Sequence, residues 1–335
     1  AAWWRKLELK DLVIIPGLIF LGWGMSYAFR DSYLELSLYS SLILYLLTVL
    51  VIARKADWWI PLLTLIAALN RETAVFIPLL FIACRFPARS VTPSSRIRSG
   101  IIFILSLGIY FAVFRELRSF FGWKRLDCCW NHRPGLEMIR FNVSHSLTWA
   151  KLMWTLNILP VAAAFTFPVW PRPLKRIAVL MVPIWIGVNI CYQWTSEVRF
   201  LLMPLALVLI PATLVMINRN GRRISALFEA RKRKILFLIV ILSLTLVTVY
   251  TQCWVLGTRY LRESQLGRHL DVLNNRACNP WQYRVLSEGF SFLFLKAGSA
   301  VGFSSPVIPF IFFRALQNIA IFLLAAAFYR RLQLS

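Results

Sequence analysis

Acidic residues and histidines are scarce in this sequence. The 335 residues include 14 Asp and Glu against 38 Lys and Arg, so the formal net charge is +24, and there are only 3 histidines. His132, His145 and His269 are far apart and lack the spacing of metal ligands. No metal site is therefore predicted from them, and the excess of positive charge suggests a negatively charged surface or partner.

The sequence also lacks the short motifs of the large soluble enzyme classes. It contains no P-loop, no dinucleotide-binding fingerprint and no nucleophile elbow. The cysteines show no metal spacing either, and Cys84 and Cys191 lie in apolar runs. A disulfide between the Cys128-Cys129 pair and Cys278 stays open as an alternative in an oxidising compartment.

Apolar residues, in contrast, are abundant. Hydrophobic residues make up 59% of the chain, the mean hydropathy is +0.65, and the apolar runs are long enough to cross a bilayer. This composition predicts an all-α, polytopic integral membrane protein. The Lys and Arg residues fall mostly between the apolar runs, where they fix topology and contact anionic headgroups. Membrane lipids, and not nucleic acid, are therefore the expected partners of the positive charge.

The apolar runs predict about eight full spans in one transmembrane domain, 1–335. The basic residues place both termini in the cytoplasm, with an inner linker at 218–234. Aromatic and basic residues in the outer loops, 115–150 and 256–290, indicate interfacial helices that lie on the bilayer. The predicted spans are 11–29, 34–52, 100–114, 152–170, 177–193, 200–217, 235–255 and 306–328.

One apolar segment, 58–84, does not fit a single span. Basic residues flank both ends, which conflicts with one crossing, and two full crossings would need about 40 residues. A re-entrant pair of half-helices resolves the conflict, with Asn70, Arg71 and Glu72 at its tip. Ionisable residues at membrane depth cost on the order of 3 kcal/mol each, so we expect the tip to be buried in protein or to face a wet cavity.

Two polar outer segments lie on the side toward which this tip points. One is the segment 196–200, which precedes the predicted span 200–217, and the other is the loop 270–286. Together with the tip they predict a site in which arginines hold an anion and a carboxylate transfers a proton. Structural ion pairs that pin helices together are the alternative. The candidate residues are Asn70, Arg71, Glu72, Glu197, Arg199, Asp271, Gln282, Tyr283 and Arg284.

These segments resemble the GT-C superfamily of polytopic membrane glycosyltransferases, which use polyprenyl-phosphate-linked sugars. The resemblance is carried by A-L-N-R-E-T-A at 68–74, S-E-V-R-F-L-L-M-P at 196–204, Asp271, and N-P-W-Q-Y-R-V-L at 279–286. It implies an inverting enzyme of a prokaryotic cytoplasmic membrane, with its site on the outer side. Asp271 would be the catalytic base, and a divalent cation there, Mg²⁺ or Mn²⁺, stays open.

The resemblance further implies roles for the other candidates. The residues implied to hold or orient the donor phosphate are Arg71, Arg199 and Arg284, with Asn70, Glu72, Glu197, Gln282 and Tyr283 beside them. A transporter or lipid flippase is a second interpretation of this sequence. A non-catalytic subunit that binds other membrane proteins is a third.

The order of the segments departs from the family. In the family the Asp loop follows the first span, whereas Asp271 follows the seventh predicted span. Joining Ser335 to Ala1 would restore the family order. We therefore hypothesise that the chain is permuted, or cut and renumbered, relative to its relatives. This hypothesis requires both ends of the chain on the same face of the membrane.

Overall fold

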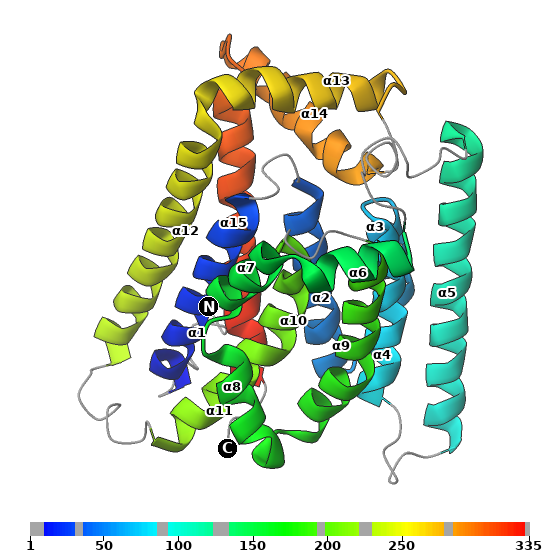
Figure 1. The fold of residues 1–335 in the computed structure, drawn as a ribbon, viewed down its shortest axis with the longest axis vertical. Helices are drawn as coiled ribbons and strands as arrows, with labels where there is room; N and C mark the ends of the chain where they lie inside the picture. Colours follow the sequence, from blue (N-terminus) through cyan, green and yellow to red (C-terminus); the bar gives the residue numbers. More distant parts are fainter. Residues whose placement is uncertain are drawn as a thin grey trace.

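The protein is an all-α helix bundle (Figure 1). The computed structural model describes residues 10–30, 36–85, 93–122, 134–192, 198–220, 230–277 and 284–331. Within these ranges there is no strand, and five helices are long and apolar enough to cross a membrane, or six if one bent pair forms a single span. This confirms the prediction of a multi-pass membrane helix bundle, but the part of the chain described here supports fewer than the eight full spans expected.

The long apolar helices form most of the bundle. They are α2 (Leu36–Ala53), α5 (Pro93–Phe121), α9 (Arg172–Tyr192), α12 (Ala230–Tyr260) and α15 (Val307–Arg331). Helix α5 continues well past residue 114, where the sequence predicts an outer loop. It stands at one edge of the bundle in Figure 1 and packs on the helices of the segment 58–84.

The other predicted spans are interrupted or shorter. Helices α7 (Ser146–Leu156) and α8 (Leu159–Thr166) meet at a bend of 64°. Asn157 has a φ of 54° at this bend, and Pro160 lies in the first turn of α8, so the two cannot form one straight helix. The predicted span at 152–170 is therefore bent, and the pair counts as a sixth crossing only if both helices form one span.

The chain from residue 198 to 220 also changes helix type several times. It contains η6 (Val198–Leu201), α10 (Leu202–Pro204), the π-helical η7 (Leu205–Leu209) and α11 (Ile210–Asn220). Pro204 and Pro211 lack the backbone N–H that a continuous α-helix requires. Only Leu202–Val215 forms an apolar stretch here, which is shorter than the predicted span 200–217.

Helix α1 (Lys10–Arg30) lies at the centre of the core, against α11, α12 and α15. Glycine allows this close packing: a Cβ at Gly24 would lie 2.3 Å from Leu205 Cδ2, and one at Gly17 would lie 2.9 Å from Ile210 Cγ2. The start of α1 and the end of α15 lie at the same end of the bundle (Figure 1). The permutation hypothesis requires this arrangement and stays a hypothesis.

The segment 58–84 folds as a short helical hairpin. It consists of η2 (Asp57–Trp59), α3 (Ile60–Ala68), η3 (Glu72–Val75) and α4 (Phe76–Arg85). Arg85 Nη2 lies 2.5 Å from Asp57 Oδ1, so the first residue of the first arm contacts the last residue of the second arm. The residues from 57 to 68 rise about 18 Å at 1.5 Å per residue, less than a bilayer core. Insertion of the hairpin into the membrane stays a prediction.

Three short helices lie near one end of the bundle. Gly257, with φ 66° and ψ 153°, breaks α12, and the chain continues through η10 (Leu261–Gln265) into α13 (Leu266–Leu273), which lies across the top of the bundle in Figure 1. Together with α14 (Val285–Ala300), these helices form what we call the cap of the bundle, and α14 connects it to the hairpin. The predicted outer loop 256–290 is therefore largely helical where it is described. The predicted loop 115–150 likewise contains a helix, α6 (Leu136–Ser144).

Candidate functional site

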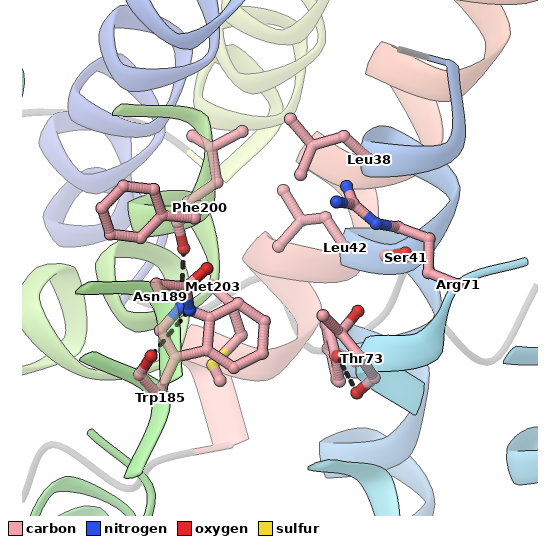
Figure 2. Close-up of a pocket in the computed structure, with 11 residues that line it drawn as sticks. Leu38, Ser41, Leu42, Arg71, Thr73, Trp185, Asn189, Phe200 and Met203 are labelled. Carbon is pink, nitrogen blue, oxygen red and sulfur yellow. Dashed lines mark hydrogen bonds between the residues drawn. The ribbon is translucent and has the colours of Figure 1, made fainter. Parts of the chain in front are cut away.

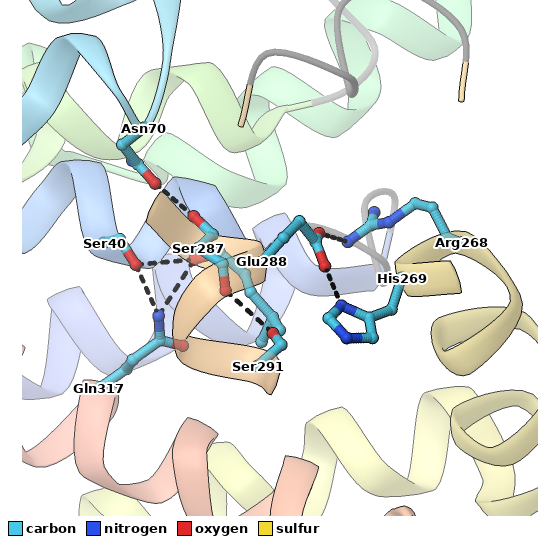
Figure 3. Close-up of polar contacts among 9 residues, drawn as sticks. Ser40, Asn70, Arg268, His269, Ser287, Glu288, Ser291 and Gln317 are labelled. Carbon is cyan, nitrogen blue, oxygen red and sulfur yellow. Dashed lines mark hydrogen bonds and ion pairs between the residues drawn. The ribbon is translucent and has the colours of Figure 1, made fainter. Parts of the chain in front are cut away.

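The hairpin tip joins the start of α14. The Leu286 backbone N–H donates to the Leu69 carbonyl at 2.9 Å, and the Ser287 hydroxyl donates to Asn70 Oδ1 (Figure 3). Asn70 has no exposed surface, and its Nδ2 donates to the Ser37 carbonyl and to Ser41 Oγ, both at 2.8 Å. One buried amide thus connects the hairpin to α2 and α14.

The hairpin tip needs such partners because its backbone leaves the helical conformation inside the bundle. Arg71 is extended, with φ −158° and ψ 153°. The Tyr110 hydroxyl donates to the Glu72 carbonyl at 2.9 Å, and the Tyr45 hydroxyl donates to the Thr73 carbonyl at 2.7 Å. Helices α2, α5 and α14 therefore supply the hydrogen bonds that a buried non-helical segment requires.

The buried Arg71 side chain lines a narrow cavity between α2 and α9. Figure 2 shows it extending from the hairpin toward Leu38 and Leu42. The cavity volume is about 20 Å³, which is enough for about one water molecule. Polar groups and one indole line part of the rest, namely Ser41, Tyr45, Thr73, Asn189 and Trp185, and the remaining lining residues are the apolar Phe200, Leu202 and Met203. In this conformation the cavity can hold a small polar group but not a sugar ring.

Glu72 lines a different cavity from its neighbour Arg71. Tyr110, Phe114 and Arg118 of α5 form the walls around it. Glu72 Oε1 is buried and has no hydrogen-bond partner in the described part of the chain. The adjacent charged residues of the tip therefore face opposite sides of the hairpin, which disfavours a simple ion pair between them.

A second polar cluster joins α13 to α14. His269 Nδ1 lies 2.7 Å from Glu288 Oε2, and Arg268 Nη2 lies 3.5 Å from Glu288 Oε1, with all three side chains buried (Figure 3). Burial raises the pKa of the Glu288 carboxyl, but the hydrogen bond with His269 and the charges of Arg268, His269 and Arg284 outweigh burial. The pKa of Glu288 therefore lies below its ordinary value.

Sequence reasoning missed this cluster. Gln265, Arg268, His269 and Val272 are buried and follow the i, i+3, i+4, i+7 spacing of one helical face. This spacing was the available signal, but the face is mostly polar, so it does not read as an amphipathic core stripe.

The predicted base, Asp271, lies on the other face of α13. Its side chain is 52% exposed, and its Oδ1 lies 3.7 Å from Arg276 Nε. Its backbone carbonyl accepts from the N–H groups of Arg276 and Ala277, which closes the end of the helix. Among the described residues no hydrogen bond or ion pair joins Asp271 to Arg71 or to Arg284. Arg284 itself is buried at the start of α14, near Glu288.

No family model, no curated protein and no solved structure matches this chain. The membrane character therefore rests on the helices themselves.

Several predicted residues lie outside the described ranges. These are Glu197, Gln282 and Tyr283, together with the cysteines of the disulfide that the sequence left open, Cys128, Cys129 and Cys278. The backbone of Arg199 lies in η6. Cys84, Cys191 and Cys253 are free thiols. In the ranges that the structure covers, no group of three or more His, Cys, Asp or Glu residues is arranged to hold a metal ion.

The buried charges around the two clusters are mostly positive. Glu288 is the one fully buried carboxylate in the described ranges, whereas the buried guanidinium groups belong to Arg71, Arg268, Arg284 and Arg314. Guanidinium groups at low dielectric bind phosphate and carboxylate strongly and with defined geometry. An exposed carboxylate at the edge of such a region can accept a proton. In the described ranges the buried guanidinium groups thus outnumber the buried carboxylates.

Proposed function

We propose that the protein is a membrane glycosyltransferase that moves a sugar, with inversion, from a polyprenyl-phosphate donor to an acceptor. The observation that carries the proposal is the junction of the hairpin tip with α14. It ties together the segments that hold Arg71 and Arg284, although more than 200 residues separate them in the chain. Loss of the polyprenyl phosphate places negative charge on the phosphate, which guanidinium groups stabilise.

Asp271 is the base in this proposal. It accepts the proton of the acceptor hydroxyl, a role worth about 10²–10⁴-fold in rate. Its exposed position on α13 leaves it open to an acceptor from the aqueous side. Because the Arg71 cavity is narrow, donor binding has to move the hairpin or α13 to admit the headgroup. The site lies at the outer face of a prokaryotic cytoplasmic membrane, with both termini cytoplasmic.

The test uses the full chain reconstituted in lipid vesicles with a panel of polyprenyl-phosphate sugars. We expect consumption of one donor and release of polyprenyl phosphate. Asp271→Asn should lower the rate at least about 100-fold, while Glu263→Gln, at an exposed carboxylate of η10, should leave it unchanged. The proposal is wrong if no donor is consumed, or if Asp271→Asn retains the native rate.

A non-catalytic subunit is the second candidate, because of α5. Only 22% of the apolar window of α5 is buried, and Ile104, Phe111 and Phe120 are exposed along it. In a complex this face would contact a helix of another membrane protein. Native mass spectrometry of the protein extracted from its own membrane tests this: a stable heteromeric complex that involves α5 favours the subunit.

A further inference from the structure

Helix α13 has two faces with different partners. Arg268, His269 and Val272 point into the protein and are buried, whereas Leu270, Asp271 and Leu273 are exposed. Val272 is the only apolar residue among the buried side chains of α13. Leu266 at the start of the helix packs on the apolar cluster Leu36, Phe310 and Phe313. The buried polar contacts further along the helix that carries the proposed base converge on Glu288.

The first turn of α14 contacts both the hairpin tip and α13. Leu286 and Ser287 bond to Leu69 and Asn70 of the tip, and the next residue, Glu288, contacts His269 and Arg268 (Figure 3). Successive helical residues point about 100° apart, so a single turn can reach two elements. Three consecutive residues of α14 thus link α13 to the hairpin tip.

We propose that Glu288 is a positioning residue, which holds α13 through Arg268 and His269 and so fixes Asp271 relative to the hairpin tip. It does not touch substrate. A carboxylate is needed here because it accepts from two cationic or imidazole donors at once, which neither an amide nor a hydroxyl does equally well. The positional consequence for catalysis rests on the proposed function, since that function makes Asp271 the base.

The experiment measures the position of α13 and the reaction separately. Hydrogen exchange of the α13 amides in the reconstituted full chain reports on the helix without any assumption about activity. With Glu288→Gln we expect faster exchange in α13 and unchanged exchange in α15, and Glu288→Asp should restore part of the protection. Glu263→Gln, the matched exposed control, should change neither.

The kinetic measurement uses the donor that the native protein consumes. Misplacement of a catalytic group by about 1 Å can cost about 100-fold, so Glu288→Gln should lower kcat by up to this factor at unchanged KM for the donor. In an Asp271→Asn background the same substitution should cause no further loss, because the base that it positions is already absent. A merely structural role would lower the rate in both backgrounds.

The outcomes separate the two proposals. If Glu288→Gln exchanges faster in α13 but the native protein consumes no donor, the positioning role is retained and the transferase is overturned. If Glu288→Gln leaves α13 exchange unchanged and the native protein does consume donor, the positioning role is overturned and the transferase is retained. Equal rate losses in the native and Asp271→Asn backgrounds would also overturn the positioning role.

Discussion

Helix α13 carries two arginine–carboxylate contacts of similar length in opposite surroundings. Arg268 lies 3.5 Å from Glu288 with side chains 9% and 5% exposed, and Arg276 lies 3.7 Å from Asp271 with side chains 69% and 52% exposed. Breaking a buried pair by removing one partner costs about 3–5 kcal/mol, whereas exposed pairs contribute about 0–1 kcal/mol. Distance alone therefore does not reveal which contact holds the helix.

The comparison separates a holding role from a reacting role. A carboxylate that is buried, bonded to two groups and distant from water is fixed, and a fixed group can place its neighbours. A carboxylate in contact with solvent and weakly paired is free to meet a substrate. On this basis Glu288 belongs to the scaffold and Asp271 to the proposed chemistry, although both lie in the cap of the bundle.

The largest expected difference follows from truncating each carboxylate. Glu288→Ala leaves Arg268 and His269 buried without their shared acceptor, so the free energy of opening α13 should fall by about 3–5 kcal/mol. Asp271→Ala should lower it by about 1 kcal/mol or less. Amide exchange across α13 measures both values. Similar losses for the two variants would contradict the distinction between the buried and the exposed contact.

The Asn70 amide extends the comparison to the hairpin. Asn70→Ala removes three hydrogen bonds at a fully buried position and leaves the Ser287 hydroxyl of α14 without its acceptor. At about 1 kcal/mol each, the free energy of unfolding should fall by about 3 kcal/mol. Asn274→Ala, at an exposed asparagine just after α13, is the matched control and should have little effect. Reversible unfolding in mixed detergent followed by circular dichroism measures both.

Much of the framework could be predicted from the sequence because apolar runs and basic flanks are local signals. The expected span 34–52 corresponds closely to α2 (Leu36–Ala53), and 306–328 to α15 (Val307–Arg331). The conflict between length and flanking charge also predicted a turn at Asn70, where the chain does turn. The sequence did not reveal where helices are interrupted. The backbone at Asn157 and Pro204 interrupts helices that composition alone presents as continuous.

The buried contacts of the site were beyond the sequence for a different reason. Glu288 and His269 are 19 residues apart, and residues of two separate helices form the pair. No local spacing encodes such a contact, and a polar residue in a membrane cap is equally compatible with solvent. The sequence placed Asp271 and Arg284 in one loop. It did not show that Asp271 is exposed on α13 while Arg284 is buried at the start of α14.

Acid pH provides the smallest and most selective test of the comparison. Because the folded protein holds the pKa of Glu288 below its ordinary value, the ionised carboxylate stabilises the attachment of α13. This stabilisation is fully present above the pKa of an unfolded glutamate and is lost as pH falls through the lowered folded value. It amounts to about 1.4 kcal/mol for each unit by which the pKa is lowered.

Exchange of α13 amides, corrected for the intrinsic effect of pH, should therefore accelerate only in this acidic window. Glu288→Gln should abolish that acceleration while Asp271→Asn retains it, and the reverse pattern would assign the holding role to the exposed contact.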